Sequence, residues 1–409
     1  MSETLLAVPS EIAGLGNLTS EVGADANSAA HFIGQHGQPA DWLHGPIIDD
    51  LIQPFIEVAN ATKVRMALAA RTTQDTGTEL NKAAWMYHDQ DQQNYNALNS
   101  HTMYIDDGQS SSPNVERSGI TQQYDGAATY SKPKKFELKE PQANKEDTAE
   151  LIGQIAPTLK DVNDTIKDVA RMAGKDIDPL GMCLDKIPGN WSEIRRIGEA
   201  HKAAGNGMEA CGDNLESGMK QVDRSWNGKA AISFNDWANK QIPAMKWEGP
   251  VGRVVSDAFG VVANEIREAI RVVLTKLWDV INSQIDFSDL KGAFKTVFRK
   301  VPGVGTAYEL ISLGLKFAEI VQFAIDAVKK IKELVDKVIK LLDFLKDPVA
   351  GGKQMLNDYM APVMDKVADA THKAAIAQDV AKISQVNDTL NSPDTGYEIG
   401  SGTEPWADS

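Results

Sequence analysis

The chain has 409 residues, with 42 Lys and Arg against 57 Asp and Glu, and its formal net charge is −15. This acidic balance argues against nucleic acid as a main partner, while the length leaves room for two or three domains. Residues Met1–Ser10 lack a basic stretch followed by an apolar run, and no run of about 18 uncharged apolar residues occurs, so we expect neither a cleaved signal peptide nor a membrane-spanning helix.

Residues 1–100 predict a helical hairpin. Pro9 and Ser10 open its first helix, and the second runs from about Pro46 to about Leu98. Apolar residues recur at helical spacing on both helices, at Ile12, Leu15, Leu18, Val22, Ala26, Ala29 and Phe32 and then at Leu51, Phe55 and Val58. A hairpin with one apolar stripe on each helix cannot bury both stripes alone, so we expect it to need a partner.

The second helix carries the sequence YHDQD, residues 87–91, near its end. The i, i+4 spacing puts the Tyr87 phenol and the Asp91 carboxylate on one helix face, where a packed tyrosine and a solvated carboxylate are the simplest interpretation. Together with the VPSE start and the His44-Gly45-Pro46 turn, however, residues 1–100 resemble the EspC-like targets of type VII secretion. In that family Y-x-x-x-[DE] is the export signal, so the resemblance implies this role for Tyr87 and Asp91.

Residues 101–142 are rich in Asp, Gly, Ser, Pro, Gln and Lys and show no sustained period. Such composition is typical of a flexible linker, with a root-mean-square span of roughly 35 Å. The linker would let the first hairpin reach a later one in the same chain, although pairing between chains is equally compatible with the sequence.

Residues 143–249 predict a second helical domain. A helix over about 145–172 has a kink or a late start at Pro157, and Pro and Gly residues predict a loop over 174–189. Two further helices then flank Trp226-Asn227-Gly228. There Gly228 lets the backbone turn, and Trp226 can cover the open end of the paired helices.

Centred between two amphipathic helices, this W-x-G turn resembles the WxG family of small helical proteins that the type VII secretion system of actinobacteria exports. In the four-helix unit of that family, W-x-G of one hairpin lies beside the Y-x-x-x-D end of the other. The resemblance implies that Trp226 and Gly228 join Tyr87 and Asp91 in a composite export signal, in which exposed Tyr87 and Trp226 are aromatic anchors for the secretion ATPase.

Residues 250–382 predict long amphipathic helices, similar to the C-terminal half of EspA-like substrates. We expect a break at Gly249-Pro250, a long helix over 255–281, a short helix over 288–300 and a turn at Pro302–Gly305. Residues Phe317–Leu345 then keep a 4-3 apolar spacing, followed by a weaker helix over 353–382 and a disordered tail over 383–409.

The helix that contains Phe317–Leu345 has two interpretations. Its wide apolar face and its opposite-sign pairs at i, i+4 favour packing in a bundle or an oligomer. Seven Lys between Lys316 and Lys346 are compatible with a helix that lies on an anionic membrane surface, although interleaved Asp and Glu weaken that interpretation.

No motif for catalysis, metal binding or nucleotide binding occurs, including H-E-x-x-H, C-x-x-C, G-x-S-x-G and the P-loop. We therefore expect no enzyme, cofactor or metal site. The two cysteines, Cys183 and Cys211, leave three alternatives: buried free thiols, a bridge between them, or an intermolecular disulfide.

The sequence thus predicts an all-α protein, in which antiparallel helical hairpins of the four-helix-bundle type precede long amphipathic helices. By resemblance, it is a non-enzymatic type VII substrate, made in the cytoplasm, exported to the medium or the cell surface, and associated with virulence or the envelope. The expected partners are the secretion ATPase, a cytosolic chaperone, and either further copies of the chain or a helical co-substrate. The alternative is an effector whose residues 250–382 act on a target membrane.

Overall fold

The computed structural model describes residues 5–40, 45, 47–101, 122–142, 146–172, 176–185, 187, 190–284, 305–349 and 352–399. Within these ranges the fold is all-α, as predicted, and holds no β-strand. The short helix expected over 288–300 lies outside the described residues, as does most of the Pro302–Gly305 turn.

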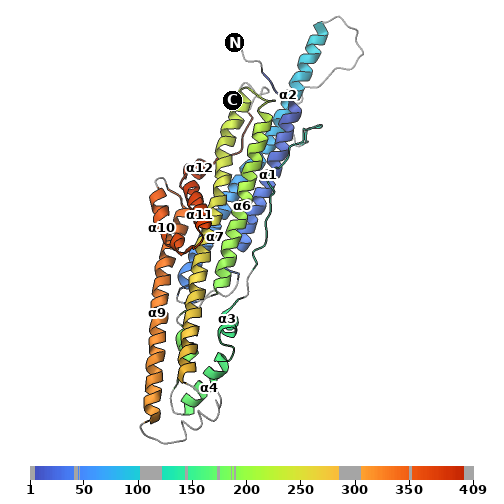
Figure 1. Cartoon of the computed structure of the whole chain (residues 1–409). Helices are drawn as coiled ribbons and strands as arrows, with labels where there is room; N and C mark the ends of the chain where they lie inside the picture. The colour runs from blue at the N-terminus through green and yellow to red at the C-terminus, as the bar shows by residue number, and fades with distance from the viewer. Residues whose placement is uncertain are drawn as a thin grey trace.

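Two antiparallel hairpins form an elongated four-helix bundle (Figure 1). One hairpin consists of α1 (Pro9–His36) and α2 (Asp49–His101), and the other of α6 (Trp191–Val222) and α7 (Lys229–Gln284). All four helices contribute to one apolar core, which includes Ile12, Leu15, Val22, Met66, Leu80, Ala204, Met208, Leu215, Phe234 and Met245. The two predicted hairpins therefore bury their stripes against each other within a single chain.

Helices α6 and α7 approach until their backbones touch. A Cβ atom on Gly252 would collide with the carbonyl oxygen of His201, and one on Gly205 would collide with the carbonyl oxygen of Glu248. Because this packing is continuous, α7 runs unbroken through Pro250, although the proline cannot donate a helical hydrogen bond. The predicted break at Gly249-Pro250 is therefore wrong.

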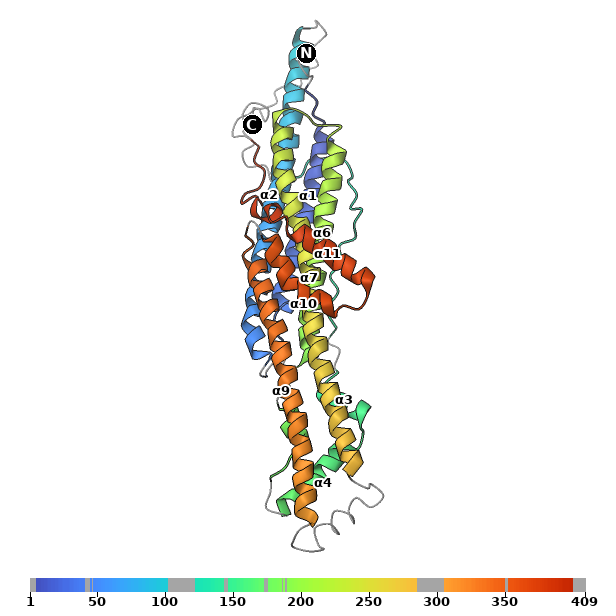
Figure 2. The ribbon, with the colours of Figure 1, turned by 60° about the vertical axis from the view of Figure 1, so that its left-hand side comes forward.

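The second half of α7 projects beyond the bundle and supports a second core. Figure 2 shows α9 (Gly305–Lys346) alongside it. The remaining helices around this core are α3 (Thr148–Ile155), α4 (Leu159–Met172), α5 (Pro179–Leu184), α10 (Lys353–Lys366), α11 (Ala370–Ile383) and α12 (Asn387–Leu390). Most of the predicted stripe of α9 is buried here, including Phe317, Ala324, Ile331, Val335, Val338, Leu342 and Leu345. Among the helices in the described ranges, none is both long enough and apolar enough to cross a membrane.

Of the short helices α3, α4 and α5, the first two agree with the sequence prediction and the third does not. Helices α3 and α4 are separated around Pro157, where a kink or late start is predicted. In contrast, α5 forms inside the loop predicted over 174–189. The Asp178 side chain accepts a hydrogen bond from the Gly181 N–H, and Pro179 occupies the first helical turn, so this segment has the start signals of a helix.

Two segments for which the sequence predicts flexibility make specific contacts. The first, residues 122–142, is here called the linker strap; it lies along α1 and α6 without forming a helix. The second, residues 392–399, is here called the C-terminal strap, and it contacts α2 and α7. The expectation of free segments is corrected for these parts of 101–142 and 383–409, because side chains and backbone groups of the straps find partners on the bundle.

A buried histidine lies where the hairpins meet. His201 on α6 is 2% exposed, and its ring stands edge-on to Phe259 with the centroids 6.1 Å apart. Burial first, and then the nearby charge of Arg65, lower the pKa of His201 to about 3, although a hydrogen bond with the Gly37 backbone opposes the shift. The imidazole is therefore neutral in the folded chain at neutral pH.

We predict opposite effects of alanine at two glycines of α7. Gly252→Ala should lower the free energy of unfolding by about 1–3 kcal/mol, because the new methyl group is forced into the α6 backbone. Gly260→Ala is the matched control: a Cβ there meets nothing within 4 Å, so the substitution should raise the free energy of unfolding by about 0.5–1 kcal/mol. Denaturant unfolding followed by circular dichroism measures both, and equal effects would contradict the close helix contact.

We further predict that stability falls as the pH drops from 6.5 to 5. Because the folded-state pKa of His201 is depressed, the unfolded chain binds a proton in this window while the folded chain does not. Proton binding to His201 alone should therefore lower the free energy of unfolding by up to about 1.4 kcal/mol per pH unit. His201→Gln should flatten this slope, and an identical slope in the variant would refute the assignment.

Candidate functional site

The W-x-G turn between α6 and α7 is held by the N-terminal segment. The Asn227 N–H donates to the Leu6 carbonyl oxygen at 2.8 Å, and the Leu6 N–H donates to Asn227 Oδ1 at 2.7 Å. Ala7 and Trp226 form an isolated antiparallel β-bridge. Gly228 has φ of +91°, a conformation that a side chain would strain, so the turn requires glycine at this position.

Trp226 and Tyr87 meet at this end of the bundle, although they come from different hairpins. The Trp226 Nε1–H donates to Tyr87 Oη across 3.4 Å, a little beyond the usual range of about 2.7–3.2 Å for such a hydrogen bond. Phe234, one turn into α7, lies 5.7 Å from Trp226 between ring centroids. The structure thus brings together the aromatic members of the set proposed from sequence, with Gly228 in the same turn.

Both aromatic residues are buried, which corrects the expectation that they are exposed anchors. Trp226 is 3% exposed and Tyr87 is 5% exposed. Both belong to the apolar core of the bundle, and the C-terminal strap adds to their cover: its Tyr397 is 4% exposed and places its ring edge-on to Trp226, with 6.4 Å between centroids. Burial raises the pKa of Tyr87, while its hydrogen bond with Trp226 acts in the opposite direction.

Asp91 lies one helical turn beyond Tyr87 and is exposed. It is close to a second aromatic group, in which Tyr124 of the linker strap packs on Trp85 with the ring centroids 4.9 Å apart. Tyr124 Oη also lies 3.1 Å from His88 Nδ1. Burial first, and then the negative charges of Asp91 and Asp89, raise the pKa of Tyr124. Asp91 therefore presents its carboxylate at the surface, beside the buried pair rather than within it.

Sequence reasoning missed Tyr397 and Tyr124. Each is an aromatic residue in a segment whose composition is otherwise typical of disorder. Burial of a bulky aromatic side chain contributes a large favourable free energy. A tyrosine in such a segment therefore indicates a residue that could anchor the segment to the folded core. Neither residue belongs to a periodic pattern, which is why periodicity alone did not reveal it.

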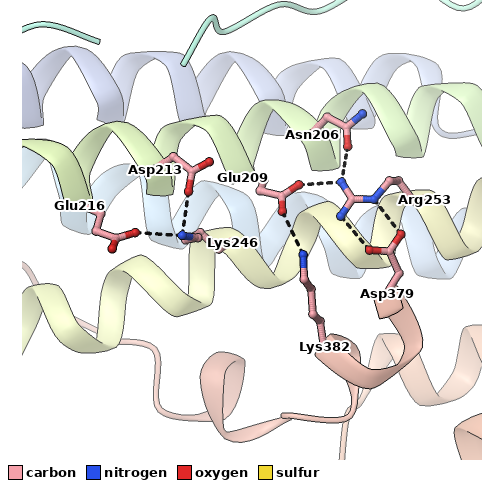
Figure 3. Close-up of polar contacts among 8 residues, drawn as sticks. All are labelled: Asn206, Glu209, Asp213, Glu216, Lys246, Arg253, Asp379 and Lys382. Atoms are coloured by element: carbon pink, nitrogen blue, oxygen red, sulfur yellow. Dashed lines mark hydrogen bonds and ion pairs between the residues drawn. The ribbon is translucent and has the colours of Figure 1, made fainter. Parts of the chain in front are cut away.

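A polar network fastens α11 to the hairpin of α6 and α7 (Figure 3). Arg253 contacts Glu209 at 2.6 Å, Asn206 at 2.7 Å and both oxygens of Asp379 at 2.8 and 2.9 Å. Burial alone would lower the pKa of Arg253, but its hydrogen bonds with Asp379 and Glu209 outweigh burial and raise it. The guanidinium of Arg253 on α7 thus links Glu209 and Asn206 of α6 to Asp379 of α11.

The neighbouring Lys246 bridges Asp213 at 2.7 Å and Glu216 at 2.9 Å. A cleft of about 350 Å³ adjoins these groups, and Lys246, Trp247, Lys382 and Asp388 are among its lining residues. Glu209 and Glu216, which also line the cleft, already form ion pairs. The arrangement is that of a helix-docking contact, because Lys246, Glu209 and Glu216 all have partners of opposite charge.

Cys183 and Cys211 are both free and buried. They belong to different apolar cores, Cys183 to the one around the second half of α7 and Cys211 to the four-helix bundle. Burial raises the pKa of Cys183 to about 11 and raises that of Cys211 as well. Over the described part of the chain, no cluster of His, Cys, Asp and Glu is arranged to hold a metal ion.

No protein-family model matches the chain, and neither a curated protein nor a solved structure matches it. The functional argument therefore rests on the geometry described above and on the motifs in the sequence.

We predict that neither thiol reacts in the native protein. A thiol-specific reagent should label Cys183 and Cys211 at less than about a hundredth of the rate seen in denaturant, because burial removes both access and thiolate. Mass spectrometry after timed labelling measures this. Rapid native labelling, or a covalent dimer on a non-reducing gel, would contradict the buried placement.

Proposed function

We propose that this protein is a non-enzymatic substrate of a type VII secretion system, exported in its folded form. Tyr87, Asp91, Trp226 and Gly228 would form its composite export signal. The observation that carries the proposal is the contact between Trp226 Nε1 and Tyr87 Oη, which joins the W-x-G turn of one hairpin to the Y-x-x-x-D helix of the other. This juxtaposition is the one that the resemblance to WxG and EspC-like proteins implies.

The position of each group supports a recognition role. Gly228 allows the turn that carries Trp226, and the Tyr87 hydroxyl accepts a long hydrogen bond from the indole. Asp91 adds an exposed carboxylate one turn away, which gives a partner a directional charge contact. Because both hairpins are in one chain, a single folded molecule carries every part of the proposed signal.

The expected partners follow from this role. The secretion ATPase would read the composite signal, and a cytosolic chaperone would hold the protein before export. After export to the medium or the cell surface, the long helices α7 and α9 would support assembly with further copies or with a helical co-substrate. The alternative function, action of residues 250–382 on a membrane, requires the packed helices to separate, since most of the apolar stripe of α9 lies against the protein core.

We predict that Asp91→Asn reduces export at least about tenfold, as expected when a contact of about 1.4 kcal/mol is lost. Asp89→Asn is the matched control, because it removes a neighbouring carboxylate outside the motif. Asp91 is exposed, so the variant should keep the helicity and the unfolding midpoint of the wild type. Tyr87→Ala should abolish export. Because Tyr87 is buried, the stability of this variant must be measured as well.

The measurement compares culture filtrate with cell pellet in an actinobacterial host, with and without a working type VII ATPase. Export that depends on the ATPase and on Asp91, but not on Asp89, would support the proposal. Normal export of Asp91→Asn together with Tyr87→Ala would rule out the composite signal. If the wild type stays in the cytosol, the proposal of export fails, and the chain resembles WxG and EspC-like proteins in architecture only.

A further inference from the structure

We propose that the C-terminal strap is a displaceable cover over the Trp226–Tyr87 pair, so that the pair is presented to a partner only when the strap leaves. The inference rests on the proposed function for the identity of that partner, the secretion ATPase. The cover itself rests on contacts in this chain.

The strap occupies the groove between α2 and α7. The Tyr397 N–H donates to Thr76 Oγ1 of α2 at 2.8 Å, and the Trp237 Nε1–H of α7 donates to the Thr395 carbonyl oxygen at 3.2 Å. Between these two points, Gly396 lies against the backbone of α2, where a Cβ would be 3.0 Å from the Thr72 carbonyl oxygen. The strap therefore follows the groove closely over these residues.

Tyr397 is the side chain that closes the groove. Its ring stands edge-on to Phe234, with the centroids 5.9 Å apart and the planes at 88°, and edge-on to Trp226 at 82°. Such edge-to-face geometry is the favoured arrangement of aromatic rings. With Tyr397 in place, Trp226 and Tyr87 are inaccessible to any protein in solution.

Two features of the strap would allow it to leave the groove. Residues 392–399 form no helix or strand, so they lack the cooperative hydrogen bonds of the bundle. Within the described residues, the buried Tyr397 Oη has no hydrogen-bond partner, although a buried hydroxyl normally finds one. Displacement would return this hydroxyl to water, and the hydrogen-bonding groups of Thr76 and Trp237 would be free to bind another chain.

The vacated groove defines the chemistry of its partner. It would offer the Trp237 indole N–H to a carbonyl oxygen, the Thr76 hydroxyl to a backbone N–H, and the Trp226 and Phe234 rings to an aromatic side chain. We therefore infer that the partner presents an extended segment with an aromatic residue, and that this segment takes the place of Tyr397.

Hydrogen exchange of the tryptophan indoles tests the cover in the full-length chain. Tyr397→Ala should accelerate exchange of the Trp226 and Trp237 indole protons at least about tenfold, because local opening no longer breaks an aromatic contact. The Trp247 indole, which donates to the Ile383 carbonyl oxygen in the other core, is the internal reference and should not change. Tyr359→Ala on α10, a partly buried tyrosine packed on that other core, is the matched control and should leave Trp226 protected.

Binding to the purified ATPase tests the regulation. Tyr397→Ala should bind more tightly than the wild type, and Trp226→Ala should remove the gain when combined with it. Unchanged exchange at Trp226 in Tyr397→Ala would overturn the cover, and equal ATPase binding of wild type and Tyr397→Ala would overturn its regulatory role. If export proves independent of Asp91 and Tyr87 while exchange accelerates, the proposed function fails and the strap stands as a cover of this pair.

Discussion

The backbone contact between α6 and α7 is the interaction on which the rest of the structure depends. Gly205 and Gly252 remove the side chains that would hold the helices apart, so dispersion contacts accumulate along both flanks of the crossing. The continuous packing carries α7 through Pro250 as one helix. A single rigid element therefore completes the four-helix bundle with its first half and supports α9, α10 and α11 with its second.

The same pairing determines where the aromatic group forms. The tight turn between α6 and α7 places Trp226 at one end of the bundle, and Tyr87 arrives there only when the α1–α2 hairpin docks. The pair is thus a product of tertiary structure, since the two residues are far apart in the chain. A partner that recognises it would distinguish the folded molecule from an unfolded chain, which no linear motif achieves.

The elements that the sequence predicts well are those with a period. The stripe from Ile12 to Phe32 and the helices around Trp226 follow from helical spacing, because burial of one face selects those residues. The break expected at Pro250 was wrong, because local propensity yields to packing that only the partner helix supplies. A packed Tyr87 is the simplest interpretation of its helical spacing, and the structure agrees with it. The contact of Tyr397 with Trp226 could not be predicted, because Tyr397 lies in a segment without any pattern.

The two straps fill different grooves of the bundle, and their attachments differ in kind. The linker strap lies along α1 and α6, where Asn214 binds both the N–H and the carbonyl oxygen of Lys134 and where Lys132 pairs with Asp25 at 3.0 Å. The C-terminal strap is joined to the bundle by single hydrogen bonds at Thr76 and Trp237, by the partly buried Ile399, and by the Tyr397 ring, whose hydroxyl finds no partner in the described chain. Although most of its residues are exposed, the paired polar contacts of the linker strap join it to both hairpins. In the C-terminal strap, the unsatisfied Tyr397 hydroxyl lowers the cost of opening, and this strap is the one that lies on the aromatic pair.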